Sequence, residues 1–578
     1  MRPGLTSPAE KCHPVNSRPT GSVIGKKEAG EEMNKKFYRT GWGAPVLLAL
    51  LLLAALVARV PAVYGELSDH PGRVVYFGAG GQESVSGSLH ALEFAGDLYL
   101  VDVGSFIGGE GRNYPWPAEL DPAALRGVFI THAHTDHLGR LPLLLQEGYR
   151  GPIYMSRITY AIARLTLPAN LEYADLGPER FYYSRHNQGR ERIPVHLEGS
   201  EGGVAAVQPA NRVYFSASRP ELSARGYYLA RPVREKLAAD LLERLAEQVV
   251  IVDPGQELEL ASAGLLASFI ATSHIPGSVM VRFDYQGFTV LFSGDVGGDS
   301  SPLLPANPRL EQPLDVLFLE GTYAYGQRAD LARERERFRR EVAELVTAGK
   351  RVVIPAFVLD RSQQVMFEIS RAIGEGRLPP AQTIRVCSPS AHQLLRLYAD
   401  FAADYRSDRT LAAYFSPAMA GADFLPPGYV PRCSGDRPAN PLGLEPGEIG
   451  IMSSGMADYA AARQALLDYL EDPQTVFYFV GYQAPGSLGG RLTATPPPAS
   501  LRIGDQQRRV RAEIRQTAAF ASHADPAEML RIFAGTRPER IFLIHLDKDR
   551  GPGLAARYRQ ELGAEIIIPR PGQRYRLR

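Results

Sequence analysis

From residue 66 onward, the chain contains short runs of apolar residues that each end close to a His, Asp or Glu side chain. Runs of this length, bounded by glycine and polar residues, are typical of buried strands. When such strands form a sheet, the polar residues that follow them gather along one rim, where a pocket can form. The pattern therefore predicts one site that is built from strand ends carrying Asp102, His132, His274, Asp295, Glu320 and His545.

The residues from 329 to 475 follow a different pattern, in which amphipathic helical segments alternate with short apolar runs. This βαβ rhythm predicts a parallel sheet inserted as its own unit. The predicted elements are helices at 333–348, 361–373 and 391–405 and strands at 351–354 and 384–387.

Two loops of this unit follow predicted strands and carry serines. Backbone N–H groups at the helix starts of such loops can bind phosphate. Ordinary helix-capping turns account for the same serines equally well. The candidate phosphate-binding residues are Ser388, Ser390, Ser453 and Ser454.

The pattern of polar, basic and apolar residues at the N-terminus indicates that the protein is exported. Residues 1–32 are polar and predict either a disordered segment or one that precedes a natural start at Met33. Basic residues and an apolar run at 44–58 follow, a length that suits a signal peptide and is shorter than the roughly 20 residues of a spanning helix. We therefore interpret residues 33–65 as an export signal, with an uncleaved anchor through residues 42–64 as the alternative. A periplasmic, extracellular or membrane-anchored location is expected, rather than a cytoplasmic one.

Composition narrows the function classes only slightly. The 578 residues are 45% hydrophobic and 22% charged, with a formal net charge of +1, so no global electrostatic attraction to nucleic acid is expected. The three cysteines are too few for a thiolate metal site, but Cys387 and Cys433 could pair in an oxidising compartment. A polar, tyrosine-bearing segment at 173–228 predicts an insertion that could cover the cleft, and residues 234–248 predict an amphipathic helix.

The densest candidate site lies at residues 131–137, where three histidines and one aspartate occur within six positions. Residues two apart in an extended segment face the same way, so His132 and His134 can converge on one ion. Asp136 and His137 lie where a helix is predicted to begin, and therefore point to a neighbouring position. A single metal rarely needs four ligands so close together, so this spacing predicts two metals rather than a polar turn.

These motifs resemble the metallo-β-lactamase superfamily and, within it, the β-CASP nuclease branch. Residues 132–137 match the H-x-H-x-D-H motif, and residues 480–492 and 355–361 resemble the two ends of a β-CASP insert. The resemblance covers roughly residues 70–578. Further matching positions are Asp102, His274, Asp295, Glu320, His523 and His545.

The resemblance implies an α/β fold, an αββα sandwich interrupted by a β-CASP domain. On this basis we expect a first sandwich part at 66–328, a β-CASP domain at 329–475 and a return to the sandwich at 476–578. Two zinc ions are implied, which would activate a hydroxide for phosphodiester cleavage. One zinc would be held by His132, His134 and His274 and the other by Asp136, His137 and His545, with Asp295 bridging and Asp102 orienting a ligand. His523 would act as general acid, held by Glu320, with Asp136 also at the reacting centre.

The resemblance also implies a substrate. A histidine at the position of His545 accompanies RNA nucleases in the family, so we expect a ribonuclease whose partner is RNA or another phosphodiester. The alternative is an exported hydrolase of the same fold that acts on a small ester, a lactam or an extracellular nucleic acid. A non-enzymatic protein on a degenerate fold is disfavoured, because every ligand position is filled. Membrane attachment and a homodimer remain open.

Overall fold

The computed structural model describes residues 72–578, with gaps at 83, 107–115, 171–180, 185–192, 195–226, 229–230, 300, 324–328, 434–441 and 548. The predicted leader at 33–65 and residues 1–32 lie outside the described residues. Of the predicted insertion at 173–228, only three short strands are described: β6 (Phe181–Ser184), β7 (Ile193–Pro194) and β8 (Tyr227–Tyr228). Within the part of the chain that the structure describes, no helix is both long and apolar enough to cross a bilayer.

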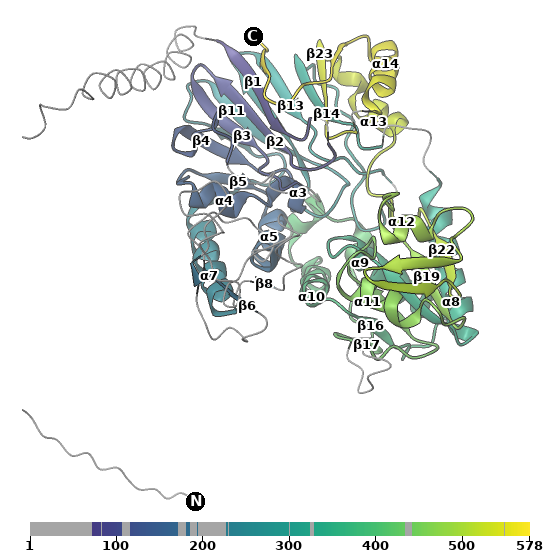
Figure 1. Ribbon diagram of the computed structural model, residues 1–578. Helices are drawn as coiled ribbons and strands as arrows, with labels where there is room; N and C mark the ends of the chain where they lie inside the picture. The colour runs from purple at the N-terminus through teal and green to yellow at the C-terminus, as the bar shows by residue number, and fades with distance from the viewer. Residues whose placement is uncertain are drawn as a thin grey trace, which may run out of the picture. The chain divides into compact units, whose positions relative to one another are not determined.

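Two seven-stranded sheets form a sandwich (Figure 1). The first sheet has the order β25-β1-β2-β3-β4-β5-β9 and the second has the order β10-β11-β12-β13-β14-β23-β24. The first contains β1 (Val74–Gly80), β2 (Leu89–Phe94), β3 (Asp97–Val101), β4 (Leu125–Phe129), β5 (Ile153–Met155), β9 (Val249–Ile251) and β25 (Arg574–Arg576). The second contains β10 (Glu257–Glu259), β11 (Leu265–Ala271), β12 (Val279–Tyr285), β13 (Phe288–Phe292), β14 (Val316–Glu320), β23 (Arg540–Ile544) and β24 (Glu565–Ile567).

The alternation of side chains along β14 shows how the layers are held together. Val316 and Phe318 belong to the aromatic-rich core between the two sheets, whereas Leu317 and Leu319 pack on the opposite face against helices. Successive residues of a strand point to opposite faces, so a strand that is buried throughout joins two cores.

Helices cover both outer faces of the sandwich. On the first sheet these are α4 (Leu141–Gln146), α5 (Arg157–Asn170) and α7 (Arg231–Gln248), and on the second α13 (Pro526–Phe533) and α14 (Gly551–Leu562). The result is an αββα arrangement. Short elements complete it: η1 (Pro122–Ala124), α3 (Thr135–Leu138) and η6 (Ala534–Thr536).

The inserted unit contains a six-stranded, entirely parallel sheet in the order β17-β16-β18-β15-β19-β22. Its strands are β15 (Arg351–Pro355), β16 (Ile384–Val386), β17 (Tyr429–Val430), β18 (Ile449–Met452), β19 (Thr475–Phe479) and β22 (Glu513–Gln516). The predicted helices and strands are found as α8 (Leu331–Thr347), β15, α9 (Arg361–Gly374), β16 and α10 (Pro389–Asp404), followed by α11 (Ala460–Tyr469). Asp330 begins α8 by accepting hydrogen bonds from the N–H groups of Ala332 and Arg333.

The sheet of the inserted unit extends past residue 475, the boundary expected from the sequence. β19 pairs with β15, and β22 then pairs with β19, so the chain returns to the sandwich only after β22, first through α13 and then through β23. Strand pairing between segments this far apart in sequence is a tertiary choice that local pattern does not encode. Between β19 and β22 lie α12 (Leu488–Leu492), β20 (Ser500–Ile503) and β21 (Gln506–Arg509), and before β17 lie η4 (Arg409–Ala413) and η5 (Pro417–Met419).

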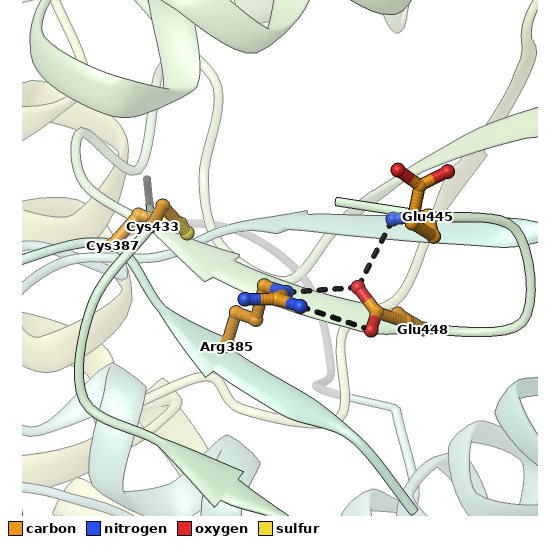
Figure 2. Close-up of a disulfide and its surroundings, with 5 residues drawn as sticks. All are labelled: Arg385, Cys387, Cys433, Glu445 and Glu448. Atoms are coloured by element: carbon orange, nitrogen blue, oxygen red, sulfur yellow. Dashed lines mark hydrogen bonds and ion pairs between the residues drawn. A yellow bond between two sulfur atoms is a disulfide. The ribbon is translucent and has the colours of Figure 1, made fainter. Parts of the chain in front are cut away.

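A disulfide joins Cys387, which follows β16, to Cys433, which follows β17 (Figure 2). The two Cα atoms are 4.9 Å apart, a separation that suits a disulfide. Beside it, the Arg385 guanidinium donates to both carboxylate oxygens of Glu448 at 2.8 and 3.1 Å. The sequence left this pairing open, and the fold brings the two cysteines together because β16 and β17 are neighbouring strands.

Candidate metal centre

Three imidazole nitrogens converge at the ends of β4 and β11. The Nδ1 atom of His134 lies 3.1 Å from Nε2 of His132 and 3.1 Å from Nε2 of His274. Burial lowers the pKa of all three histidines, so their rings are neutral at pH 7 and offer lone pairs. Separations near 3 Å are expected when three nitrogens bind one ion at about 2.0–2.1 Å each.

A second group of ligand atoms lies beside the first and contains Asp136, His137 and His545. Nε2 of His545 is 3.5 Å from Oδ2 of Asp136. Burial alone would raise the pKa of Asp136, but the close His545 imidazole and the other nearby histidines lower it to about 2, so the carboxylate is ionised. The first set thus offers three imidazoles and the second offers two imidazoles and a carboxylate, the ligands that suit zinc and similar divalent metals.

Asp295, which follows β13, points one carboxylate oxygen toward each of the two groups. Its Oδ2 atom lies 3.5 Å from Nε2 of His274 and 3.7 Å from Nε2 of His132. Its Oδ1 atom lies 3.3 Å from Nε2 of His137 and 3.5 Å from Nδ1 of His545. A carboxylate in this position can bind one ion with each oxygen.

Unpartnered buried atoms support a cation at this place. Among the described residues, Nε2 of His137, Nε2 of His545 and Oδ1 of Asp295 are buried without a hydrogen-bond partner. Buried polar atoms are normally paired, and buried carboxylates require compensating charge. The residues present therefore fit metal ions.

Asp102 orients the second group. Its Oδ2 atom lies 2.7 Å from Nδ1 of His137, and its Oδ1 atom accepts a hydrogen bond from the backbone N–H of Thr131 at 2.8 Å. Holding Nδ1 in this way leaves Nε2 of His137 to face the metal position, as is usual for a metal-binding histidine. Asp102 and His545 both have positive φ angles, of 61° and 50°, a conformation that is uncommon for non-glycine residues and recurs at functional sites.

A close backbone approach fixes the loop that carries these ligands. The N–H groups of Ser88 and Val103 donate to the carbonyl oxygens of Asp136 and His137 at 2.9 and 2.7 Å. A Cβ atom at Gly104 would lie 1.6 Å from the carbonyl oxygen of Asp136, so only glycine fits there.

His523 and Glu320 form a pair at the side of the metal centre. Nδ1 of His523 lies 3.0 Å from Oε1 of Glu320, and the His523 ring is 4.7 Å from the His274 ring. Glu320 is buried, whereas the His523 side chain is 21% exposed and is therefore accessible to a substrate. Burial lowers the pKa of His523, but the carboxylate of Glu320 outweighs this and raises the pKa to about 9.

Two of the four predicted phosphate-binding serines accept hydrogen bonds from nearby backbone N–H groups. The Oγ atom of Ser388 caps α10 by accepting from the N–H of Ala391, and that of Ser454 accepts from the N–H of Asp458 in the loop before α11. Both are ordinary local contacts between a serine and the backbone. Phosphate binding by these serines and by Ser390 and Ser453 stays a prediction.

Sequence reasoning missed two residues that contact the predicted ones, and a third, Arg361, that contacts Ser522 beside His523. Thr131 bonds Asp102, Thr322 places its Oγ1 atom 2.8 Å from Nδ1 of His545, and Arg361 donates from Nη2 to Oγ of Ser522 at 3.4 Å. Thr131 and Thr322 adjoin predicted site residues in sequence, and that adjacency was the signal available.

Three family models match successive parts of the chain. The metallo-beta-lactamase superfamily model matches residues 91–349, the Beta-Casp domain model matches 362–492, and the model of the Zn-dependent metallo-hydrolase RNA specificity domain matches 507–569. The chain belongs to the β-CASP branch of the metallo-beta-lactamase superfamily. The family and the fold class predicted from the sequence are thereby confirmed.

Relatives of this β-CASP protein extend over most of its length. Ribonuclease TTHA0252 of Thermus thermophilus is 28% identical, over 87% of this chain and 99% of its own. The transcription termination factor FttA of Methanothermobacter thermautotrophicus is 23% identical, over 94% of this chain and 80% of its own. The endoribonuclease YSH1 of Eremothecium gossypii is 21% identical over 81% of this chain, which spans about half of that protein (54%).

Proposed function

We propose that this protein is a metal-dependent ribonuclease that hydrolyses phosphodiester bonds of RNA at a centre of two zinc ions. The observation that supports this proposal most directly is the position of Asp295, whose two carboxylate oxygens face two separate sets of ligands. The match to an RNA specificity domain and the names of two relatives, a ribonuclease and an endoribonuclease, support RNA as the substrate.

Seven side chains would hold the metals in this proposal. When bound, the two ions would lower the pKa of a nucleophilic water and neutralise phosphate charge. Asp102 keeps the His137 ring in place through Nδ1, and Thr322 does the same for His545. The proposed ligands are His132, His134 and His274 for one ion and Asp136, His137 and His545 for the other, with Asp295 between them.

His523 would supply the proton in this reaction. Its Nδ1 atom is held by Glu320, so the proton that it can transfer is on Nε2. With a pKa raised to about 9, the ring is protonated at neutral pH and can donate to the leaving oxygen of the phosphodiester.

Metal analysis and substrate choice test the proposal together. The full chain should contain two equivalents of zinc, and it should cleave labelled single-stranded RNA. A chelator should abolish this cleavage, and added zinc should restore it. Cleavage of bis-p-nitrophenyl phosphate without cleavage of RNA would contradict the ribonuclease assignment. One zinc per chain in active protein would contradict the two-ion centre.

We also propose that the protein is exported, which would make its substrate RNA outside the cytoplasm. The apolar run at 44–58 and the Cys387–Cys433 disulfide support this proposal, because disulfides persist mainly in oxidising compartments. N-terminal sequencing after cell fractionation tests it. A soluble exported chain that begins near residue 66 would support a cleaved signal, and a membrane-bound chain that keeps residues 42–64 would support the anchor. Light scattering decides between a monomer and a homodimer.

A further inference from the structure

The carboxyl edge of the inserted sheet adjoins the candidate metal centre. Strands β18, β15, β19 and β22 are parallel neighbours, so the loops that follow them lie along one edge. The loop after β22 carries His523. Ligands of parallel α/β sheets bind outside the carboxyl ends of the strands, so the other loops of this edge are candidate substrate contacts.

Three of these loops present an exposed aromatic ring. Phe357 follows β15 and is 37% exposed, Tyr459 lies beyond β18 and is 58% exposed, and Tyr482 follows β19 and is 62% exposed. They are three of the eight large hydrophobic side chains that are exposed among the described residues. Single exposed apolar residues are ordinary, but several at one edge indicate a binding surface.

The Phe357 ring lies close to the loops that follow β18 and β19. A Cβ atom at Gly455, in the loop after β18, would lie 2.8 Å from Cδ2 of Phe357. A Cβ atom at Gly481 would lie 3.8 Å from Cε2 of Phe357, and Tyr482 is the next residue. A side chain at Gly455 would therefore clash with the ring, whereas Gly481 lies at ordinary contact distance from it, so the partly exposed Phe357 ring packs against the loops after β18 and β19.

A chain of contacts leads from this ring to the reacting centre. The Cβ position of Gly481 is also 3.9 Å from Nε of Arg361, whose Nη2 donates to Oγ of Ser522 at 3.4 Å. The carbonyl oxygen of Ser522 is 3.1 Å from Nδ1 of His274, and His523 follows directly. A continuous path of contacts through Gly481, Arg361 and Ser522 thus connects the Phe357 ring with the proposed metal ligand His274.

We infer that Phe357 and Tyr482, with Tyr459 at the rim, form a base-stacking subsite for a nucleotide of single-stranded RNA beside the bond that is cut. The inference rests on the proposed ribonuclease function and names the part of the protein that holds the substrate. Aromatic rings stack on any base, so the subsite favours unpaired RNA without reading its sequence. A duplex would keep its bases stacked on one another and would not reach these rings.

Kinetics on two substrates of different size test the subsite. Phe357→Ala and Tyr482→Ala in the full chain should each raise KM for a labelled single-stranded RNA by about 5- to 150-fold, the range measured for loss of one base stack. Both variants should change hydrolysis of bis-p-nitrophenyl phosphate, which has no base, less than they change cleavage of RNA. Leu425→Ala is the matched control, because Leu425 is 36% exposed and precedes β17 at the other end of the sheet order.

An RNA with an abasic nucleotide next to the cleaved bond gives a second, independent measurement. The penalty of Phe357→Ala or Tyr482→Ala should be smaller on this substrate than on intact RNA. Equal losses on RNA and on the small diester would indicate a structural role and overturn the inference, as would unchanged KM for RNA. If the wild-type chain cleaves no RNA, the proposed function fails by itself. Binding of the same RNA to His523→Ala protein then decides the subsite, which is overturned if Phe357→Ala leaves the affinity unchanged.

Discussion

Nδ1 of His523 lies 3.0 Å from Oε1 of Glu320, and the same oxygen accepts a hydrogen bond from the N–H of Val296 at 3.1 Å. The other carboxylate oxygen, Oε2, accepts from the N–H of Thr322 at 2.9 Å. Glu320 is therefore fixed by the backbone on both oxygens, and it in turn fixes the tautomer and direction of the His523 ring. Nε2 remains as the atom that can meet a substrate.

Replacing Glu320 by Gln should shift the pH dependence of catalysis. The carboxylate raises the pKa of His523 to about 9 against the opposing effect of burial, so its removal lowers that pKa. The acid form is then lost at lower pH, and the alkaline limb of the kcat profile should move toward acid pH. A profile of kcat from pH 5 to pH 10 measures the shift. Glu147→Gln, at an exposed position after α4, is the control, and an unmoved alkaline limb would contradict the role of Glu320.

His134→Ala and His523→Ala should lose activity for different reasons. His134 contributes Nδ1 to a converging set of nitrogens, so its loss should reduce bound metal and abolish cleavage. His523 lies beside the ligands and is not needed to hold metal, so its loss should slow kcat by about 100- to 10,000-fold with full metal content. Elemental analysis of both purified variants, together with their kcat values, makes the comparison. Metal loss in His523→Ala would count against the acid role.

Asp102→Asn should weaken metal binding while leaving every proposed ligand in place. The substitution removes the negative charge that faces Nδ1 of His137 at 2.7 Å, and such supporting contacts contribute about 10- to 100-fold to metal affinity. Competition with a chelator of known affinity measures the effect. Asp97→Asn is the matched control, since Asp97 pairs with Arg126 away from the site. Equal zinc affinity in Asp102→Asn and the wild type would refute an orienting role.

Reduction of the Cys387–Cys433 disulfide should lower thermal stability. The cysteines are 46 residues apart, and closing a loop of that length stabilises a protein by about 4 kcal/mol in the chain-entropy model. Cys387→Ser should melt at a lower temperature than the wild type, and a reductant should lower the Tm of the wild type alone. Calorimetry with and without reductant gives both values. A Tm of the wild type that does not respond to reductant would show that the disulfide contributes no stability.

Short-range pattern allowed several elements to be predicted within a few residues. Helix α9 was expected at 361–373 and spans Arg361–Gly374, and α8 was expected at 333–348 and spans Leu331–Thr347. These elements depend on amphipathic spacing, which is local to each segment. The placement of polar residues at strand ends was also visible, and it led to the candidate ligands that the structure brings together.

The amino-acid sequence by itself determined which side chains are available as ligands and that they follow buried strands. Only the tertiary structure decided how they meet: one oxygen of Asp295 faces His274 and the other faces His137. It also placed β19 and β22 in the inserted sheet and brought Phe357 close to Gly481, the residue before Tyr482. The physical reason is the range of the interactions. The spacing of hydrophobic residues, which predicts a helix or a strand, is a property of one segment. Strand pairing and site geometry depend instead on contacts between segments that are hundreds of residues apart.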